Sequence, residues 1–276
     1  TDGFTVGSLD QLNTNTEDFV SWNWFGSNST STNEDGSIDS TITVAEAGHF
    51  SVGTYTGNGT DNATVGHGLG GIPEMIIVKN RPDAVHGLCW HKDAAGSPSA
   101  NTQADWARAA TFSVSSSKFG GTNSTLPSST VFKMGNHVEI NPSSKSVVFY
   151  AFRSIPGVCH VGNYTGTGSN PGGPYVSCGF TPRWILFKNP VSADFNWTVF
   201  DTARDPINGP GKEFMLVSGA FAAFRSSGSL LGVDFLADGF KVLTTGGNGG
   251  QNGINYVYIA MADIGGNGTL PPIYGR

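Results

Sequence analysis

One short polar run of the chain combines carboxylates, a hydroxyl and a guanidinium. It contains the candidate binding residues Asp201, Arg204 and Asp205. Such a set could hold a polar ligand, and Asp201 would suit glycoside hydrolysis if a second acid such as Asp234 faced it across a groove. An Asp–Arg pair that stiffens a loop uses the same residue types. Because nothing in the sequence brings the two acids together, we expect a protein that is not an enzyme.

A second polar run resembles the first half of a calcium loop. Asn33, Asp35 and Asp39 alternate as oxygen donors around a glycine, as in loops that bind this ion. Val44 stands where an EF-hand needs its bidentate glutamate, so the run is not an EF-hand. Calcium binding and an ordinary polar turn both remain open. No other cofactor is expected, because no cysteine accompanies a histidine at a spacing typical of zinc sites.

Six tryptophans are the remaining candidates for ligand contact. An exposed indole can stack on a sugar ring, whereas an indole on the inner side of a strand belongs to a core. Alternation along strands assigns at least half of the six to a core. We name Trp90 and Trp197 as candidate binding residues.

Composition excludes two classes of partner. Only 13% of the 276 residues are charged and the net charge is −6, which argues against a nucleic-acid surface. No apolar run is long enough for a membrane-spanning helix, so no membrane insertion is expected. At 38% hydrophobic residues the chain can still bury a core.

The elements that must position these residues are mostly strands. Short β-branched and aromatic runs alternate with segments rich in Gly, Ser, Thr and Asn, which is the pattern of strands and tight turns. Helical periodicity is weak and predicts only one or two short helices, at 103–110 and 219–224. The expected fold is all-β, built from tandem β-sandwich (jelly-roll-like) domains.

An internal repeat sets the organisation. Three pairs of blocks are each 109 positions apart, around Tyr55 and Tyr164, Pro73 and Pro182, and Val148 and Val257. The alignment needs a shift of one residue in one place, because Phe132 corresponds to Phe240 at a spacing of 108. Units of this size match a single β-sandwich domain and are too long for solenoid repeats.

This repeat predicts four segments. Residues 50–157 form β-sandwich repeat 1, and residues 158–276 form repeat 2 with a C-terminal tail. Residues 1–24 match the end of a unit, because Phe4 and Trp24 are spaced like Phe132 and Phe152. We therefore expect residues 1–24 to be the C-terminal strand hairpin of a truncated upstream repeat, within a longer polypeptide. Residues 25–49 are then a polar linker.

The ordered motifs resemble repeat domains of large structural proteins of tailed marine bacteriophages. The residues that carry the resemblance are the blocks 55–59 and 164–168, 71–79 and 179–188, 200–205, 234–241 and 256–262. The resemblance covers nearly the whole chain, and the family has no characterised chemistry. Repeat 1 departs from it where block 200–205 should have a counterpart.

The resemblance implies a virion component, displayed outside the cell as a tail fibre, a spike, or a fibre or decoration attached to the capsid. Its implied partners are other virion proteins and copies of the same chain, as a trimer. A host-surface glycan is a further candidate partner, which would give a role in host attachment. A secreted carbohydrate-binding (lectin-like) module is the alternative function.

Overall fold

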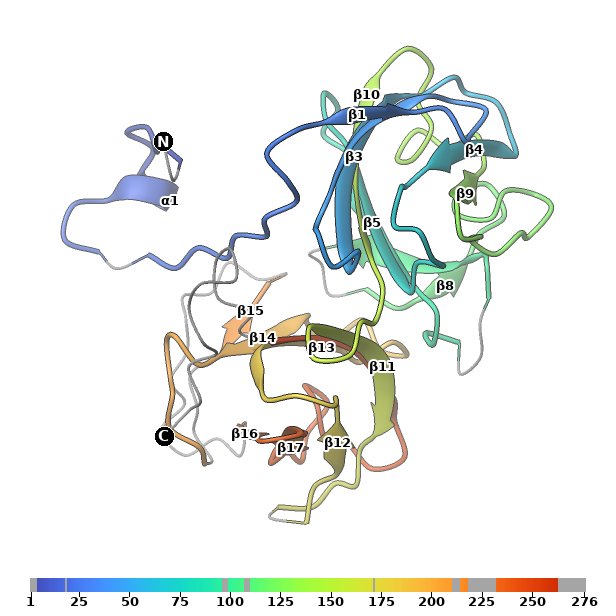
Figure 1. Cartoon of the computed structure of the whole chain (residues 1–276). Coiled ribbons are helices and arrows are strands. Elements are labelled where there is room, and N and C mark those ends of the chain that lie inside the picture. Colours follow the sequence, from blue (N-terminus) through green and yellow to red (C-terminus); the bar gives the residue numbers. More distant parts are fainter. Residues whose placement is uncertain are drawn as a thin grey trace.

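The computed structural model describes residues 4–17, 19–95, 99–106, 110–170, 172–209, 214–217 and 232–262. They form eighteen strands in antiparallel sheets and one helical turn, α1 (Asp10–Asn13). The prediction of an all-β, sandwich-like fold is confirmed. Two units are stacked one above the other, and α1 lies apart from both (Figure 1).

The first unit is one large sheet facing a small one. The large sheet has the order β1-β2-β3-β10-β5-β6-β7-β8, and the small sheet pairs β4 with β9. The strands are β1 (Ser31–Asn33), β2 (Ser40–Val44), β3 (Phe50–Thr56), β4 (Ala63–Gly66), β5 (Met75–Asn80), β6 (Gly87–His91), β7 (Thr102–Trp106), β8 (Ser113–Val114), β9 (Val131–Met134) and β10 (Ser146–Phe152).

The second unit repeats this plan with fewer strands. Its larger sheet has the order β11-β18-β13-β14-β15, and its smaller sheet the order β12-β17-β16. The strands are β11 (Cys159–Thr165), β12 (Tyr175–Ser177), β13 (Pro182–Lys188), β14 (Thr198–Asp201), β15 (Met215–Leu216), β16 (Val233–Leu236), β17 (Gly239–Val242) and β18 (Asn255–Ala262).

The larger sheets of the two units agree in strand order and in register. The order β3-β10-β5-β6-β7 corresponds to β11-β18-β13-β14-β15. Thr56 pairs with Ser146 in the first unit, and Thr165 pairs with Asn255, each 109 positions later, in the second. The internal repeat of the sequence is therefore also a repeat of strand order and register.

Each unit has its own buried core, closed by an equivalent tyrosine. The cluster around Val65, Phe132 and Phe149 fills the first unit, and the cluster around Phe187, Phe240 and Tyr256 fills the second. The Tyr55 hydroxyl donates to the carbonyl of Ile140, and the Tyr164 hydroxyl donates to that of Gly249 at 2.8 Å. Each hydroxyl satisfies a loop carbonyl from inside the core.

The glycines that follow these tyrosines are required for the same structural reason in both units. A Cβ on Gly57 would lie 2.2 Å from the carbonyl oxygen of Pro142, and a Cβ on Gly166 would lie 2.3 Å from that of Gln251. Both positions need a residue without a side chain, because a loop backbone passes against them. The repeated Tyr-Thr-Gly-x-Gly motif is thus explained by packing.

A third apolar layer lies between the units. The outward faces of the two larger sheets pack against each other through side chains that include Phe50, Met75, Leu186, Trp197 and Ile259. Several of them occupy equivalent positions, such as Ile77 with Leu186 and Phe152 with Met261. The interface therefore joins like face to like face, and both sides of β5 are buried as a result.

Three sequence-based expectations are wrong. Residues 103–106 lie in strand β7 and not in a helix, and the one described helix is α1. The segment 25–49 is not a linker, because it contains β1 and β2, and β2 pairs with β3 along five residues. Residues 4–17 and 19–24 form no strand hairpin. The proposed helix at 219–224 lies outside the described residues.

The physical reason is shared by the first two errors. Alanine-rich periodicity favours a helix at 103–106, but pairing with β6 offers four backbone partners there, and tertiary pairing outweighs propensity. In 25–49, short polar side chains alternate with Ile38 and Ile42, which are both buried. A strand with so few apolar positions has the sequence pattern of a loop, and only its pairing with a neighbouring strand identifies it.

Candidate functional site

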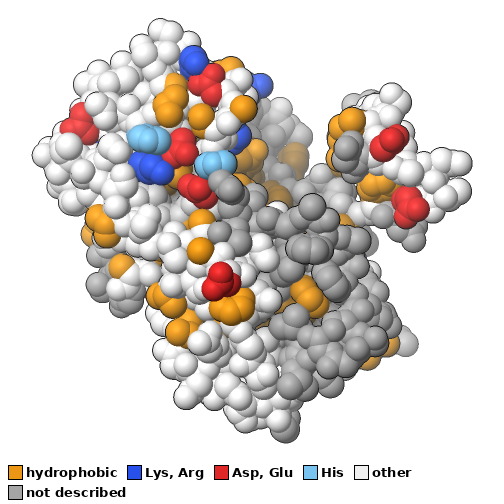
Figure 2. All heavy atoms as spheres, turned by 180° about the vertical axis from the view of Figure 1, so that it is seen from behind, with side chains coloured by type: hydrophobic (Ala, Val, Ile, Leu, Met, Phe, Trp, Pro, Cys, Tyr) orange, Lys and Arg blue, Asp and Glu red, His pale blue; other side chains and the backbone are white. Residues whose placement is uncertain are grey.

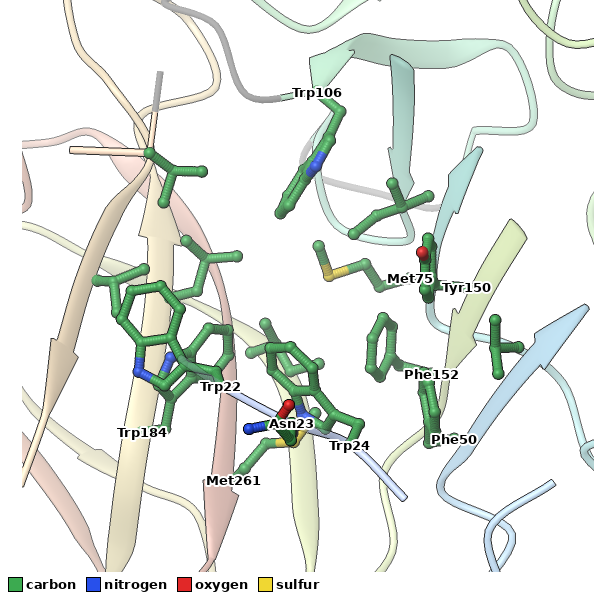
Figure 3. Close-up of a pocket in the computed structure, with 16 residues that line it drawn as sticks. Trp22, Asn23, Trp24, Phe50, Met75, Trp106, Tyr150, Phe152, Trp184 and Met261 are labelled. Carbon is green, nitrogen blue, oxygen red and sulfur yellow. Dashed lines mark hydrogen bonds between the residues drawn. The ribbon is translucent and has the colours of Figure 1, made fainter. Parts of the chain in front are cut away.

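The main pocket lies between the two units and has a volume of about 500 Å³. Apolar side chains, seven of them aromatic, make up nearly all of its wall, and the labelled ones converge on it from the N-terminal segment and from both units (Figure 3). The lining residues are Trp22, Asn23, Trp24, Phe50, Val52, Met75, Ile77, Trp106, Tyr150, Phe152, Trp184, Leu186, Val199, Val217, Ile259 and Met261. Such a wall suits an apolar or flat group better than a charged one.

Two tryptophans of the N-terminal segment close one side of the pocket. Trp24 donates from Nε1 to the sulfur of Met261 at 2.8 Å and packs edge-on against Trp184, with ring centroids 5.3 Å apart. Trp22 contacts Trp184 at 6.4 Å between centroids. The segment is thereby anchored on the second unit, although its chain continues into the first.

Two indole N–H groups at this pocket have no hydrogen-bond partner. They belong to Trp22 and Trp184, and both nitrogens are buried. A buried donor without an acceptor is costly, so a bound group with a suitably placed oxygen would gain from meeting either nitrogen.

The predicted binding residues Trp90 and Trp197 do not line the pocket. Trp90 is 2% exposed in the core of the first unit, where its Nε1 donates to the carbonyl of Ser99 at 2.8 Å. Trp197 is 1% exposed in the layer between the units, against Trp106 and Phe112. Neither ring presents a face for stacking on a sugar.

The sequence does contain a signal for the tryptophans that line the pocket. Strands β5 and β13 each contain four consecutive apolar residues, which indicates burial on both faces. One face of β13 supplies Ile185 and Phe187 to a core, so the other face, with Trp184, needs a second cover. The N-terminal tryptophans provide part of that cover.

Asp201 and Arg204 form a closed ion pair. Arg204 Nε lies 2.5 Å from Asp201 Oδ2, and the two side chains are 10% and 3% exposed. Asp201 Oδ1 also accepts from the backbone N–H groups of Ala203 and Arg204, at 3.1 and 2.9 Å. The pair therefore stiffens the turn after β14, which is the structural alternative considered from the sequence.

The ion pair nevertheless borders the main pocket. The Arg204 guanidinium carbon lies 5.4 Å from the centroid of the Trp22 ring, a cation–π distance. Asp205 accepts from the N–H of Ile207 at 3.1 Å and so caps the next turn. Asp234 lies on β16, in the smaller sheet of the same unit, whereas Asp201 ends β14 in the larger sheet.

His91 takes the place of Asp201 in the first unit. Met75 pairs with His91, and its repeat equivalent Trp184 pairs with Asp201, so the offset here is 110 and not 109. His91 Nδ1 accepts from the N–H of Asp93, and its Nε2 lies 3.2 Å from the carbonyl oxygen of Tyr258 in the second unit. The neutral ring with its proton on Nε2 satisfies both partners. Burial lowers the pKa of His91 to about 4.

The calcium candidates do not form a cluster of acids. Asn33 Nδ2 donates to Asp35 Oδ2 at 3.0 Å, and the Asp35 N–H donates to Asn33 Oδ1 at 3.2 Å. Asp39 is exposed on the approach to β2. Within the described part of the chain, no three His, Cys, Asp or Glu residues are placed to hold a metal ion. The geometry of this run is that of a polar turn.

The three cysteines are free and buried. Burial raises the pKa of Cys178 to about 12 and that of Cys89 well above its usual value, so these thiols remain protonated at neutral pH. They act as small apolar side chains.

Comparison with known proteins gives one match. Residues 1–264 match the model of the family described as "Domain of unknown function (DUF7483)". No curated protein and no solved structure matches. Among the described helices, none is long and apolar enough to cross a membrane. The family match spans the N-terminal segment and both units, and the chain therefore belongs to the DUF7483 family.

Proposed function

We propose that this chain is a non-enzymatic structural protein of a bacteriophage virion, located extracellularly in a tail fibre, spike, or capsid-attached fibre or decoration. The observation that supports this most is the like-to-like packing of two repeated β-sandwich units through an apolar layer. Such packing makes a stiff block from a duplicated module, which is what an appendage requires. The resemblance to phage repeat proteins adds the virion setting.

The polar clusters agree with a structural role. The Asp201 carboxylate is held by Arg204 Nε and by two backbone N–H groups, so it is not placed as a free acid, base or nucleophile. Contact with the host surface, and assembly with other virion proteins and with further copies of the same chain, complete the proposal.

Mass spectrometry of purified virions tests this function. The phage that encodes the chain is purified by density gradient, and its particles are digested and searched for peptides of this sequence. We expect these peptides at a copy number comparable to other appendage proteins, with antibody labelling on the outside of the particle. Their absence from infectious particles, with abundant protein in the lysate, would contradict the proposal.

A lectin-like module is the second candidate, and the aromatic wall of the pocket favours it. Trp24 is 38% exposed at this pocket and is the side chain best placed to meet a sugar ring. Asn23 is the single amide or charged side chain among the lining residues, so hydrogen bonds to sugar hydroxyls would be few. A glycan array with the wild type and Trp24→Ala distinguishes the two candidates. Saturable, sugar-specific binding that Trp24→Ala abolishes would favour the lectin.

A further inference from the structure

The N-terminal segment, here called the arm (residues 4–25), exposes an unusual amount of apolar surface. Eight of its large hydrophobic side chains are at least 37% exposed, and Phe25 reaches 69%. They are Phe4, Val6, Leu9, Leu12, Phe19, Val20, Trp24 and Phe25. The arm projects from the body of the molecule, and hydrophobic side chains lie on the surface of this projection (Figure 2).

This concentration distinguishes the arm from the rest of the surface. The other exposed large apolar side chains among the described residues, such as Ile72, Val114 and Val191, are scattered over both units. Scattered apolar residues are normal on a soluble protein, whereas a contiguous set marks an interaction surface. The arm also has no Lys or Arg and carries Asp10, Glu17 and Asp18. Its negative charge disfavours anionic lipids and nucleic acids as partners.

The arm continues the interface that joins the two units. When Phe4 and Trp24 are aligned with Phe132 and Phe152, Trp22 corresponds to Tyr150. In the second unit, the residues equivalent to Tyr150 and Phe152 are Ile259 and Met261. All six side chains line the same pocket. Residues 22–24 of the arm therefore contact the inter-unit layer through two positions that correspond to positions of β10 and β18.

We propose that the arm is a self-association element, which docks on a second copy of this chain. In the assembly, the apolar side chains of one arm pack against those of the partner's arm and against the exposed mouth of its pocket, where Trp24 and Tyr150 lie. A second copy is favoured over a foreign protein because the interface that the arm continues already joins equivalent surfaces. A two-fold contact of this kind is self-complementary. The inference rests on the proposed function in one respect, which is that an appendage requires several copies of the chain to assemble.

The test is the mass of the whole chain in solution, by sedimentation velocity over a wide range of concentration. We expect wild type to associate reversibly, and Phe19→Asp with Phe25→Asp to remain monomeric. Val191→Asp, on an equally exposed apolar residue outside the arm, is the matched control and should associate as wild type does. Unchanged near-ultraviolet circular dichroism and melting temperature would show that the variants are folded.

Hydrogen exchange provides a second readout. Amides of the arm should become protected as the wild-type concentration rises, and this change should disappear in the double variant. A wild type that stays monomeric at every concentration, or a Val191→Asp variant that dissociates as much as the arm variant, would overturn the inference. The virion experiment fails or succeeds separately, because it measures location and not association.

Discussion

The turn after β6 in the first unit and the turn after β14 in the second each need a side-chain acceptor for a backbone N–H, and they supply it from different residue types. Both follow equivalent strands beside the inter-unit layer. The first unit uses the neutral ring of His91, which caps its own turn and contacts the carbonyl of Tyr258 in the other unit. The second uses the carboxylate of Asp201, held by Arg204, whose guanidinium lies over Trp22 of the arm.

The difference teaches where a repeat is free to vary. The backbone requires an acceptor at this position in both units, so the acceptor is retained while the residue type changes. The other end of each side chain reaches different neighbours, and there the two units diverge. The polar cluster at 201–205 therefore differs from its counterpart in the first unit at the side-chain end that reaches the arm, where Arg204 lies over Trp22.

The largest expected effect comes from breaking the ion pair of the second unit. Arg204→Ala leaves the nearly buried Asp201 carboxylate without its cation and removes the cation–π contact to Trp22. We expect a loss of about 3–5 kcal/mol in the free energy of unfolding, measured by urea denaturation. Lys145→Ala breaks the more exposed pair with Asp83 in the first unit and should have little effect. Equal losses in the two variants would refute this difference.

The next effect compares equivalent glycines. Gly57→Ala and Gly166→Ala each place a Cβ against a loop carbonyl, at 2.2 and 2.3 Å, and each should cost about 2–3 kcal/mol in unfolding free energy. Gly179→Ala is the control, because its φ of +78° is strained but no atom lies within 4 Å of the added Cβ. We expect it to cost about 1 kcal/mol. If one of the paired variants is tolerated and the other is not, the two loops do not pack alike.

A smaller effect is expected from the pH dependence of the first unit. The pKa of His91 falls from 6.5 to about 4 on folding, mainly through burial. The unfolded chain therefore binds more protons, and the contribution of His91 to stability is full above pH 6.5 and is lost as the pH falls towards 4. At pH 5 this loss is about 2 kcal/mol.

His91→Asn tests this assignment. An asparagine oxygen can still accept from the N–H of Asp93, but the side chain does not titrate. Relative to wild type, the variant should be less stable at neutral pH and should lose less stability between pH 6.5 and 5. His67, whose pKa burial also lowers to about 4, retains its own acid dependence in both proteins. An identical slope in variant and wild type would contradict the role of His91.

The smallest effect concerns calcium. Asn33 and Asp35 engage each other, so we expect added Ca²⁺ to leave the melting temperature unchanged when compared with Mg²⁺ at equal ionic strength. Differential scanning fluorimetry with wild type and Asp35→Asn gives the answer. A calcium-specific rise in melting temperature that Asp35→Asn removes would show that the turn binds this ion after all.

Much of the fold was predictable from particular residues. The repeat could be predicted from Tyr55 and Tyr164 with the glycines after them. The strands could be predicted from β-branched runs such as 75–80. The candidate site was predicted less well. The tryptophans were named as a group, but Trp90 and Trp197 proved to be buried, while Trp22, Trp24, Trp106 and Trp184 line the pocket. A tryptophan in a strand looks the same whether its face meets a core or a cavity.

The sequence by itself determined the number of units, their strand content and the tight turns, because these depend on local propensity and on residues repeated at a constant spacing. Only the tertiary structure decided which sheet faces meet, that β1 and β2 join the first sheet, and that His91 replaces Asp201. These outcomes depend on pairing register and on contacts between residues far apart in the chain. A shift of one residue in register, which local patterns do not reveal, changes the neighbour of every side chain.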